Sequence, residues 1–89
     1  SSAFHTGATS FTFNTGTSGT SFVIALPPSV TISSVIDTSA LNAIITSEWV
    51  LTGTINVLDA GSTNRAYNIY QMTVAVPYAS SHAFTVTTN

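Results

Sequence analysis

The sequence predicts an all-β fold, a small antiparallel β-sandwich of jelly-roll-like type, formed by a single domain over residues 1–89. Apolar and polar residues alternate with a period of two along most of the chain, as they do in strands with one buried face. Glycines and prolines divide the chain into roughly five to seven short runs, and no stretch has the longer period of an amphipathic helix. Short strands with short links are typical of sandwiches and jelly rolls.

The first part of the chain contains three predicted strands. Residues 10–14 alternate between phenylalanine and polar side chains, and the glycine-containing segment 15–19 ends this strand. The apolar run 21–26 forms the second strand. It stops at residues 27–28, both proline, because proline cannot donate a hydrogen bond to a neighbouring strand. A third strand is predicted around residues 29–36.

The connection over residues 37–46 has two interpretations. Asp37 or Thr38 is placed to cap a single helical turn, and the pattern favours such a short turn or 3₁₀ segment. In the alternative, the segment is an irregular connection whose apolar side chains fill the core: Leu41, Ile44 and Ile45.

The strongest signal is a long β-hairpin in the second half of the chain. Residues 49–58 alternate regularly, with Trp49 expected in the core, and the polar loop 59–65 separates them from a second run over 66–76. Pro77 ends that run, and a final strand follows over residues 84–87.

The second arm of the hairpin carries large apolar side chains on both faces, with Tyr67 and Ile69 on one side. A strand that is apolar on both faces is covered on both, and one small sandwich supplies only one cover. We therefore expect a neighbouring copy of the chain to supply the other. The predicted interface includes some of four residues on the second face: Tyr70, Met72, Val74 and Val76.

The charge content excludes several classes of partner. Charged residues make up 4% of the chain, against roughly 25% in typical soluble domains. There is one arginine and no lysine, so nothing in the composition can neutralise a nucleic acid or an anionic membrane. Serine and threonine make up about a third of the chain, a composition that fits extracellular and viral structural proteins.

The usual supports of a small fold are also restricted by the composition. There is no cysteine, and the two histidines, His5 and His82, lie far apart in the sequence, so we expect no disulfide, metal or cofactor. Oligomerisation is the remaining support. No apolar run approaches the length of about 20 residues that spans a bilayer, so membrane insertion is not expected.

The acidic residues suggest turns rather than catalysis. Asp37, Glu48 and Asp59 supply enough carboxyl groups for glycoside hydrolysis, which needs two at a suitable separation. However, Asp37 and Asp59 both lie where turns are expected, and aspartate is common in turns. No Gly-x-Ser-x-Gly segment exists to expose a nucleophilic serine. We therefore expect no enzymatic activity.

Five residues are candidates for binding a sugar. In the hairpin loop, Asp59, Asn64 and Arg65 can contact sugar hydroxyls, although Asp59 and Arg65 can equally pair with each other at the surface. In the turn after the second arm, Tyr78 offers an aromatic face for stacking, with His82 nearby. Both groups lie on predicted loops, where binding residues concentrate.

The last part of the chain resembles the C-terminal ends of bacteriophage tailspikes and neck or tail appendage proteins. The similarity covers the strand 49–57 and the segment 67–87, with its tyrosine-bearing strand, its Pro77-Tyr78 turn and its final Phe-x-Val-Thr strand. The resemblance implies a homotrimeric β-sandwich at the tip of a viral fibre, part of a longer chain, which binds glycan on the host surface. The hydrolytic activity of tailspikes belongs to a β-helix that this chain does not contain.

Two other functions remain open. One is a trimerisation chaperone that is removed by self-cleavage after assembly, for which the first residue, Ser1, suits a processing point. The other is a monomeric carbohydrate-binding module of a secreted bacterial enzyme. Both are consistent with an extracellular or virion location.

Overall fold

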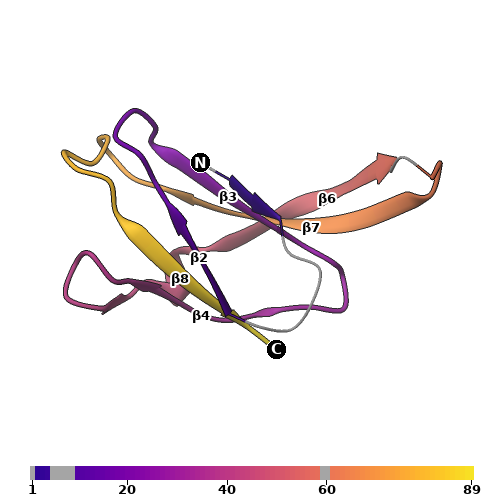
Figure 1. Ribbon diagram of the computed structural model, residues 1–89, viewed down its shortest axis with the longest axis horizontal. Helices are drawn as coiled ribbons and strands as arrows, with labels where there is room; N and C mark the ends of the chain where they lie inside the picture. Colours follow the sequence, from indigo (N-terminus) through magenta and orange to yellow (C-terminus); the bar gives the residue numbers. More distant parts are fainter. Residues whose placement is uncertain (1, 5–9, 59–60) are drawn as a thin grey trace.

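Two four-stranded β-sheets form the protein in a computed structural model that describes residues 2–4, 10–58 and 61–89 (Figure 1). The strands of the first sheet, in spatial order, are β1 (Ser2–Phe4), β3 (Ser21–Leu26), β7 (Asn64–Thr73) and β6 (Val50–Leu58). The strands of the second sheet are β2 (Ser10–Asn14), β8 (Ala83–Thr88), β4 (Ile32–Asp37) and β5 (Ala43–Ile44). Neighbouring strands are antiparallel except β1 and β3, so the predicted all-β, sandwich-like architecture is confirmed.

The predicted strands form close to their expected positions. The strands at 10–14 and 21–26 have the predicted bounds, and the hairpin of β6 and β7 and the final strand β8 are also present. Strand β4 begins later than expected, at Ile32, because the chain first turns after the two prolines, where Val30 N donates to Pro27 O at 2.9 Å. Strand β7 ends at Thr73 and not at the predicted residue 76.

The connection after β4 is a short turn, as the favoured interpretation has it, but no helical turn forms over residues 40–44, where Ala43 and Ile44 belong to β5. It makes a turn in which Leu41 and Asn42 have positive φ angles of 57° and 55°, and the only 3₁₀ turn among the described residues, η1, follows at Thr46–Glu48. Leu41 is 99% exposed and Ile44 78% exposed, so the prediction that these two side chains fill the core was wrong. Only Ile45 packs against the core.

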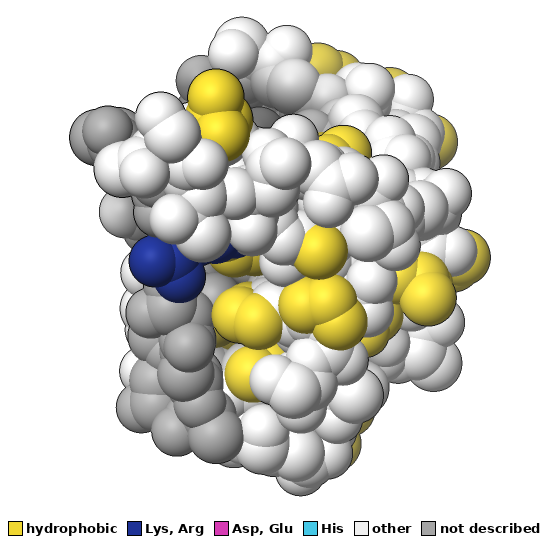
Figure 2. Space-filling model, turned by 90° about the vertical axis from the view of Figure 1, so that its right-hand side faces the viewer, with side chains coloured by type: hydrophobic (Ala, Val, Ile, Leu, Met, Phe, Trp, Pro, Cys, Tyr) yellow, Lys and Arg dark blue, Asp and Glu magenta, His cyan; other side chains and the backbone are white. Residues whose placement is uncertain are grey.

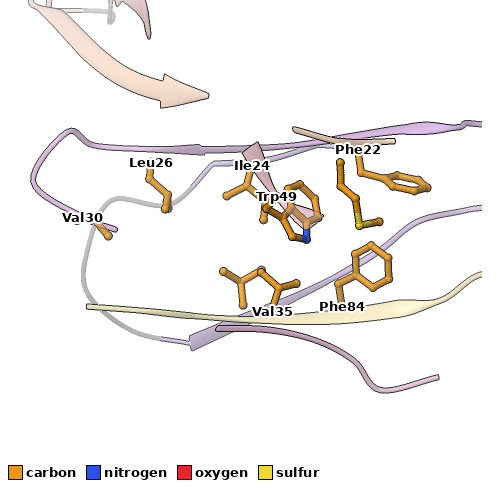
Figure 3. Packing of buried hydrophobic residues seen from close by; sticks show 9 residues of the cluster. Phe22, Ile24, Leu26, Val30, Val35, Trp49 and Phe84 are labelled. Atoms are coloured by element: carbon orange, nitrogen blue, oxygen red, sulfur yellow. The ribbon is translucent and has the colours of Figure 1, made fainter. Parts of the chain in front are cut away.

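The core lies between the two sheets (Figure 3). Alternate residues of β3, namely Phe22, Ile24 and Leu26, point towards Val35 and Phe84 of the opposite sheet, as the period of two requires (Figure 3). Trp49 lies between the sheets and is 8% exposed, which confirms its predicted burial. Its indole N–H has no hydrogen-bond partner among the described residues, a cost of about 1–3 kcal/mol that packing of the large ring offsets.

The first sheet extends well beyond this core. The protein measures 41 × 25 × 20 Å, and the tip of the β6–β7 hairpin projects past the other strands (Figure 1). Register explains which part of the hairpin is covered: β3 pairs with β7 from Ser21–Thr73 to Leu26–Asn68, so the rest of β7 has only β6 beside it among the described strands. No helix among the described residues is long and apolar enough to cross a membrane.

Candidate functional site

Most of the exposed large hydrophobic residues among the described residues lie on the projecting hairpin. All nine residues of β6 are exposed, and large apolar side chains occupy both faces of the strand. Cross-strand partners lie on the same face of a sheet, so register with β7 assigns the faces. One face carries Val50, Ile55 and Val57, beside Gln71, Tyr67 and Arg65 of β7; the other carries Leu51 and Leu58, beside Tyr70 and Asn64. We call these five exposed β6 side chains the hairpin surface.

Very little charge accompanies this apolar area. Figure 2 views the molecule from the end at which the hairpin projects, and shows hydrophobic side chains grouped among uncharged polar ones. Among the described residues drawn there, basic side chains are visible at one place and acidic side chains at none. Exposed apolar side chains grouped on one element of a small protein point to a site of interaction.

Strand β6 is also the edge of its sheet. It is last in the order β1-β3-β7-β6, and among the described strands it pairs with β7 alone. Alternate backbone N–H and C=O groups of an edge strand point away from the sheet and can pair with another chain. Natural edges are protected by lysine, proline or inward-pointing charge, and β6 has none of these. Its one irregularity is the register shift between Leu51 and Gly53, which leaves the stretch from Gly53 to Leu58 regular.

The four residues predicted to lie at a contact between copies differ in their burial. Met72 is 2% exposed and faces Phe22 inside the core, where no neighbouring chain can reach its side chain. Tyr70 and Val74 are half-buried and pack against the core, while Val76 is 71% exposed. The exposed apolar residues lie mainly on β6, which the sequence analysis did not single out.

The predicted sugar-binding residues of the hairpin loop lie at the start of β7. Asn64 and Arg65 are both exposed, and Asp59 lies outside the described residues. A shallow pocket of about 300 Å³ opens beside them and is lined by Pro27, Arg65, Ala66 and Tyr67. It combines an arginine, a tyrosine and a proline ring, the kinds of groups that hydrogen-bond to and stack on sugars.

The second predicted pair, Tyr78 and His82, is engaged within the fold. The ring of Tyr78 stacks on Phe22, with centroids 5.8 Å apart, and on the imidazole of His82, with centroids 3.9 Å apart. The structure therefore brings these two predicted residues together. A stacking platform for a sugar would have to displace one of these contacts.

His82 also hydrogen-bonds to a buried carboxylate that the sequence analysis placed in a turn. Its Nδ1 lies 2.6 Å from Oδ2 of Asp37, whose side chain is 5% exposed, while Oδ1 accepts a hydrogen bond from the backbone N–H of Ser39. The backbone of His82 is held as well, because its N–H donates to Oγ1 of Thr15 and its C=O accepts from the N–H of Thr15. These bonds tie the start of β8 to the ends of β2 and β4.

The environment of Tyr78 affects its ionisation. Burial raises the pKa of its hydroxyl above the usual 10.0, and the carboxylates of Asp37 and Glu48 raise the pKa further because they repel the phenolate. The neutral form is therefore favoured in the folded protein.

We expect the protein to lose stability as the pH rises above about 10. With its pKa raised on folding, Tyr78 ionises first in the unfolded chain, so alkali favours unfolding; below pH 10 the neutral form predominates in both states and nothing is lost. Denaturant unfolding at pH 8, 10 and 11 would measure this. Tyr78→Phe is the control, because it cannot ionise and should show a weaker dependence; equal pH dependence in both proteins would contradict the assignment.

The chain matches no family model, no curated protein and no solved structure. Within the described part of the chain, no group of three or more His, Cys, Asp or Glu side chains is placed to hold a metal ion. The site is therefore defined by its geometry alone. It is an apolar hairpin whose outer strand, β6, carries no charge and pairs on one side only among the described strands.

Proposed function

We propose that this chain is a non-catalytic assembly and attachment module, which associates with copies of itself through the hairpin surface and attaches to glycan on a host cell. The kind of protein that fits best is the receptor-binding and trimerising C-terminal domain of a phage tail appendage. The observation that carries the proposal is the exposure of all nine residues of β6, with apolar side chains on both faces. The phage assignment rests on the resemblance of the last part of the sequence.

The energetic case for self-association is straightforward. Full burial of a large aliphatic side chain is worth about 1.5–3 kcal/mol, and the hairpin surface offers five such side chains that one copy leaves partly in water. Only 4% of the residues are charged, so few charges are present to keep such an apolar surface in water. The resemblance to appendage tips implies three copies.

The attachment role is supported by the pocket beside the start of β7. Its Tyr67 and Pro27 offer apolar faces to a sugar ring, and Arg65 offers donors to hydroxyl or carboxylate oxygens. A neutral or weakly charged glycan suits a chain with a single basic residue. Several copies in one assembly would multiply weak individual contacts by avidity.

A catalytic role has less support. The buried pair of Asp37 and His82 is the one acid–base pair in contact among the described residues, and its bonds hold two strand ends together. Within the described part of the chain, no serine or threonine hydroxyl bonds to the imidazole, as nucleophilic catalysis would require. A self-cleaved trimerisation chaperone would also associate through the hairpin surface. A monomeric carbohydrate-binding module would not need an apolar surface for association.

The mass of the protein in solution tests the proposal. At micromolar concentration, light scattering is expected to give a mass above the 9.2 kDa of one chain. Ile55→Lys places a charge on the hairpin surface and should raise the concentration needed for association at least tenfold. Leu41→Lys is the matched control and should associate like the native chain, because Leu41 is exposed and belongs to the turn after β4, which lies away from the tip of the hairpin (Figure 1). A mass of 9.2 kDa for the native chain would contradict the assembly role.

Binding of the protein to host cells should change little between low and high salt, because a neutral glycan ligand offers no charge for salt to screen. A steep loss of binding with salt would contradict a neutral glycan ligand.

A further inference from the structure

The unpaired edge of β6 shows how two copies can join. Among the described residues, its outward backbone groups have no neighbouring strand, and its side chains are exposed on both faces. We infer that β6 pairs antiparallel with β6 of a second copy, around a two-fold axis perpendicular to the sheet, so that the sheet β1-β3-β7-β6 continues from one copy into the next. The inference rests on the proposed self-association through β6, and it replaces the three copies that the resemblance implies with a two-fold pairing.

The face pattern of β6 is complementary to itself. A perpendicular two-fold axis keeps each face of the sheet on the same side, and directly opposed residues of antiparallel strands lie on the same face. With the axis at Asn56, Ile55 lies opposite Val57 of the second copy, so the apolar face continues across the joint. On the other face Asn56 lies opposite its own counterpart, where two side-chain amides can hydrogen-bond to each other.

The charge distribution permits an identical partner. Like charges directly opposite each other destabilise a strand pair, and a charged strand would therefore repel a copy of itself. Strand β6 has no charged residue at any of its positions. The absence of lysine and proline also leaves the edge without the usual protection against such pairing.

The other described edges are less suited to the joint. Strand β1 has three residues and β5 has two. Strand β2 has five, of which Phe11 and Phe13 pack inward against the core. Strand β6 has nine residues and a regular stretch from Gly53 to Leu58. A stable interface buries about 800 Å² on each partner, roughly a sixth of this protein's 5009 Å² surface. The exposed faces of the hairpin can contribute to such an interface beside the paired strand edges.

The two-fold joint and the three-fold assembly implied by the resemblance make different predictions. Three copies in a ring cannot each pair β6 with another β6, because the pairing uses up two edges at a time. The joint therefore predicts a mass of two chains, or of an even number of chains.

A single introduced cysteine tests the joint, because the native chain has no cysteine. In Asn56→Cys the two thiols would face each other across the axis, with Cβ atoms about 4.5–5.5 Å apart. Mild oxidation of the folded protein should convert most of it into a disulfide-linked dimer on a non-reducing gel. Leu41→Cys, whose side chain would be exposed in a turn, is the control for random collision and should cross-link at least tenfold more slowly.

A second variant and the solution mass separate the possible outcomes. Asn56→Lys would place two ammonium groups opposite each other and should weaken association at least tenfold, while circular dichroism checks that the exposed substitution leaves the fold intact. An assembly larger than one chain without cross-linking at position 56, or with three chains, would overturn the β6 joint and leave self-association standing. A single-chain mass without cross-linking would overturn both.

Discussion

Replacement of Phe84 by alanine is expected to lower the free energy of unfolding by about 3–5 kcal/mol. Phe84 is fully buried, and its ring makes edge-to-face contacts with four other aromatic rings, those of Phe13, Phe22, Trp49 and Tyr78. Truncation removes the buried ring and leaves a cavity between the two sheets, which the strands cannot fill without moving. An 89-residue domain has a total stability of about 4–13 kcal/mol, so this loss is a large fraction of the stability of the fold.

Urea or guanidinium unfolding, followed by circular dichroism, would measure this loss. Phe84→Leu keeps most of the volume and should recover a large part of the stability, which distinguishes a packing effect from a general intolerance of substitution. Leu41→Ala removes a side chain that is 99% exposed and should change stability by no more than about 0.5 kcal/mol. If Phe84→Ala were as stable as Leu41→Ala, the arrangement of the aromatic core would be wrong.

Replacement of Asp37 by alanine should cost about 2–3 kcal/mol, the second largest expected effect. The buried carboxylate accepts hydrogen bonds from His82 and from the N–H of Ser39, and its removal leaves both donors without their partner. Because these bonds join the end of β4 to the start of β8, the loss should be felt by the whole second sheet. Asp37→Asn keeps the shape and an acceptor oxygen, and should cost less.

The matched control is Glu48→Ala, an acidic residue that is exposed on the 3₁₀ turn η1. Its loss should change stability by no more than about 0.5 kcal/mol. Thermal unfolding of the three variants beside the native protein would give the order native, Glu48→Ala, Asp37→Asn, Asp37→Ala. Equal melting temperatures for Asp37→Ala and Glu48→Ala would show that the buried pair contributes nothing to stability.

The strands were predictable because alternation is a local property of the sequence. A polar–apolar period of two over 10–14 or 49–58, or a short apolar run over 21–26 that two prolines end, identifies a strand without knowledge of its neighbours, and the three strands are present. Strand ends depend on the partner strand instead. β7 stops at Thr73 because β3, with which it pairs, begins at Ser21.

The candidate site was only partly predictable, for a related reason. Alternation shows which residues share a face, but it does not show whether another element covers that face. Met72 and Leu51 both looked like apolar residues of one hairpin, yet Met72 lies in the core between the two sheets, whereas Leu51 on the edge strand is 54% exposed. The pairing of Asp37 with His82 joins residues 45 positions apart and leaves no trace in local sequence pattern.

The position of β8 within its sheet has a consequence for the order of folding. β8 lies between β2 and β4 and pairs with both. Without β8, β2 and β4 therefore lack the strand that joins them in the sheet. During synthesis on a ribosome, β2 and β4 must therefore wait, with their apolar faces unsatisfied, until residues 83–88 have emerged from the exit tunnel. Contacts as distant in sequence as Phe11 with Val86 also make folding slow, on a scale of about milliseconds to seconds. The hairpin of β6 and β7 can form earlier because its strands are close in sequence. Its apolar edge strand β6 is then exposed to neighbouring nascent chains before the two sheets pack together.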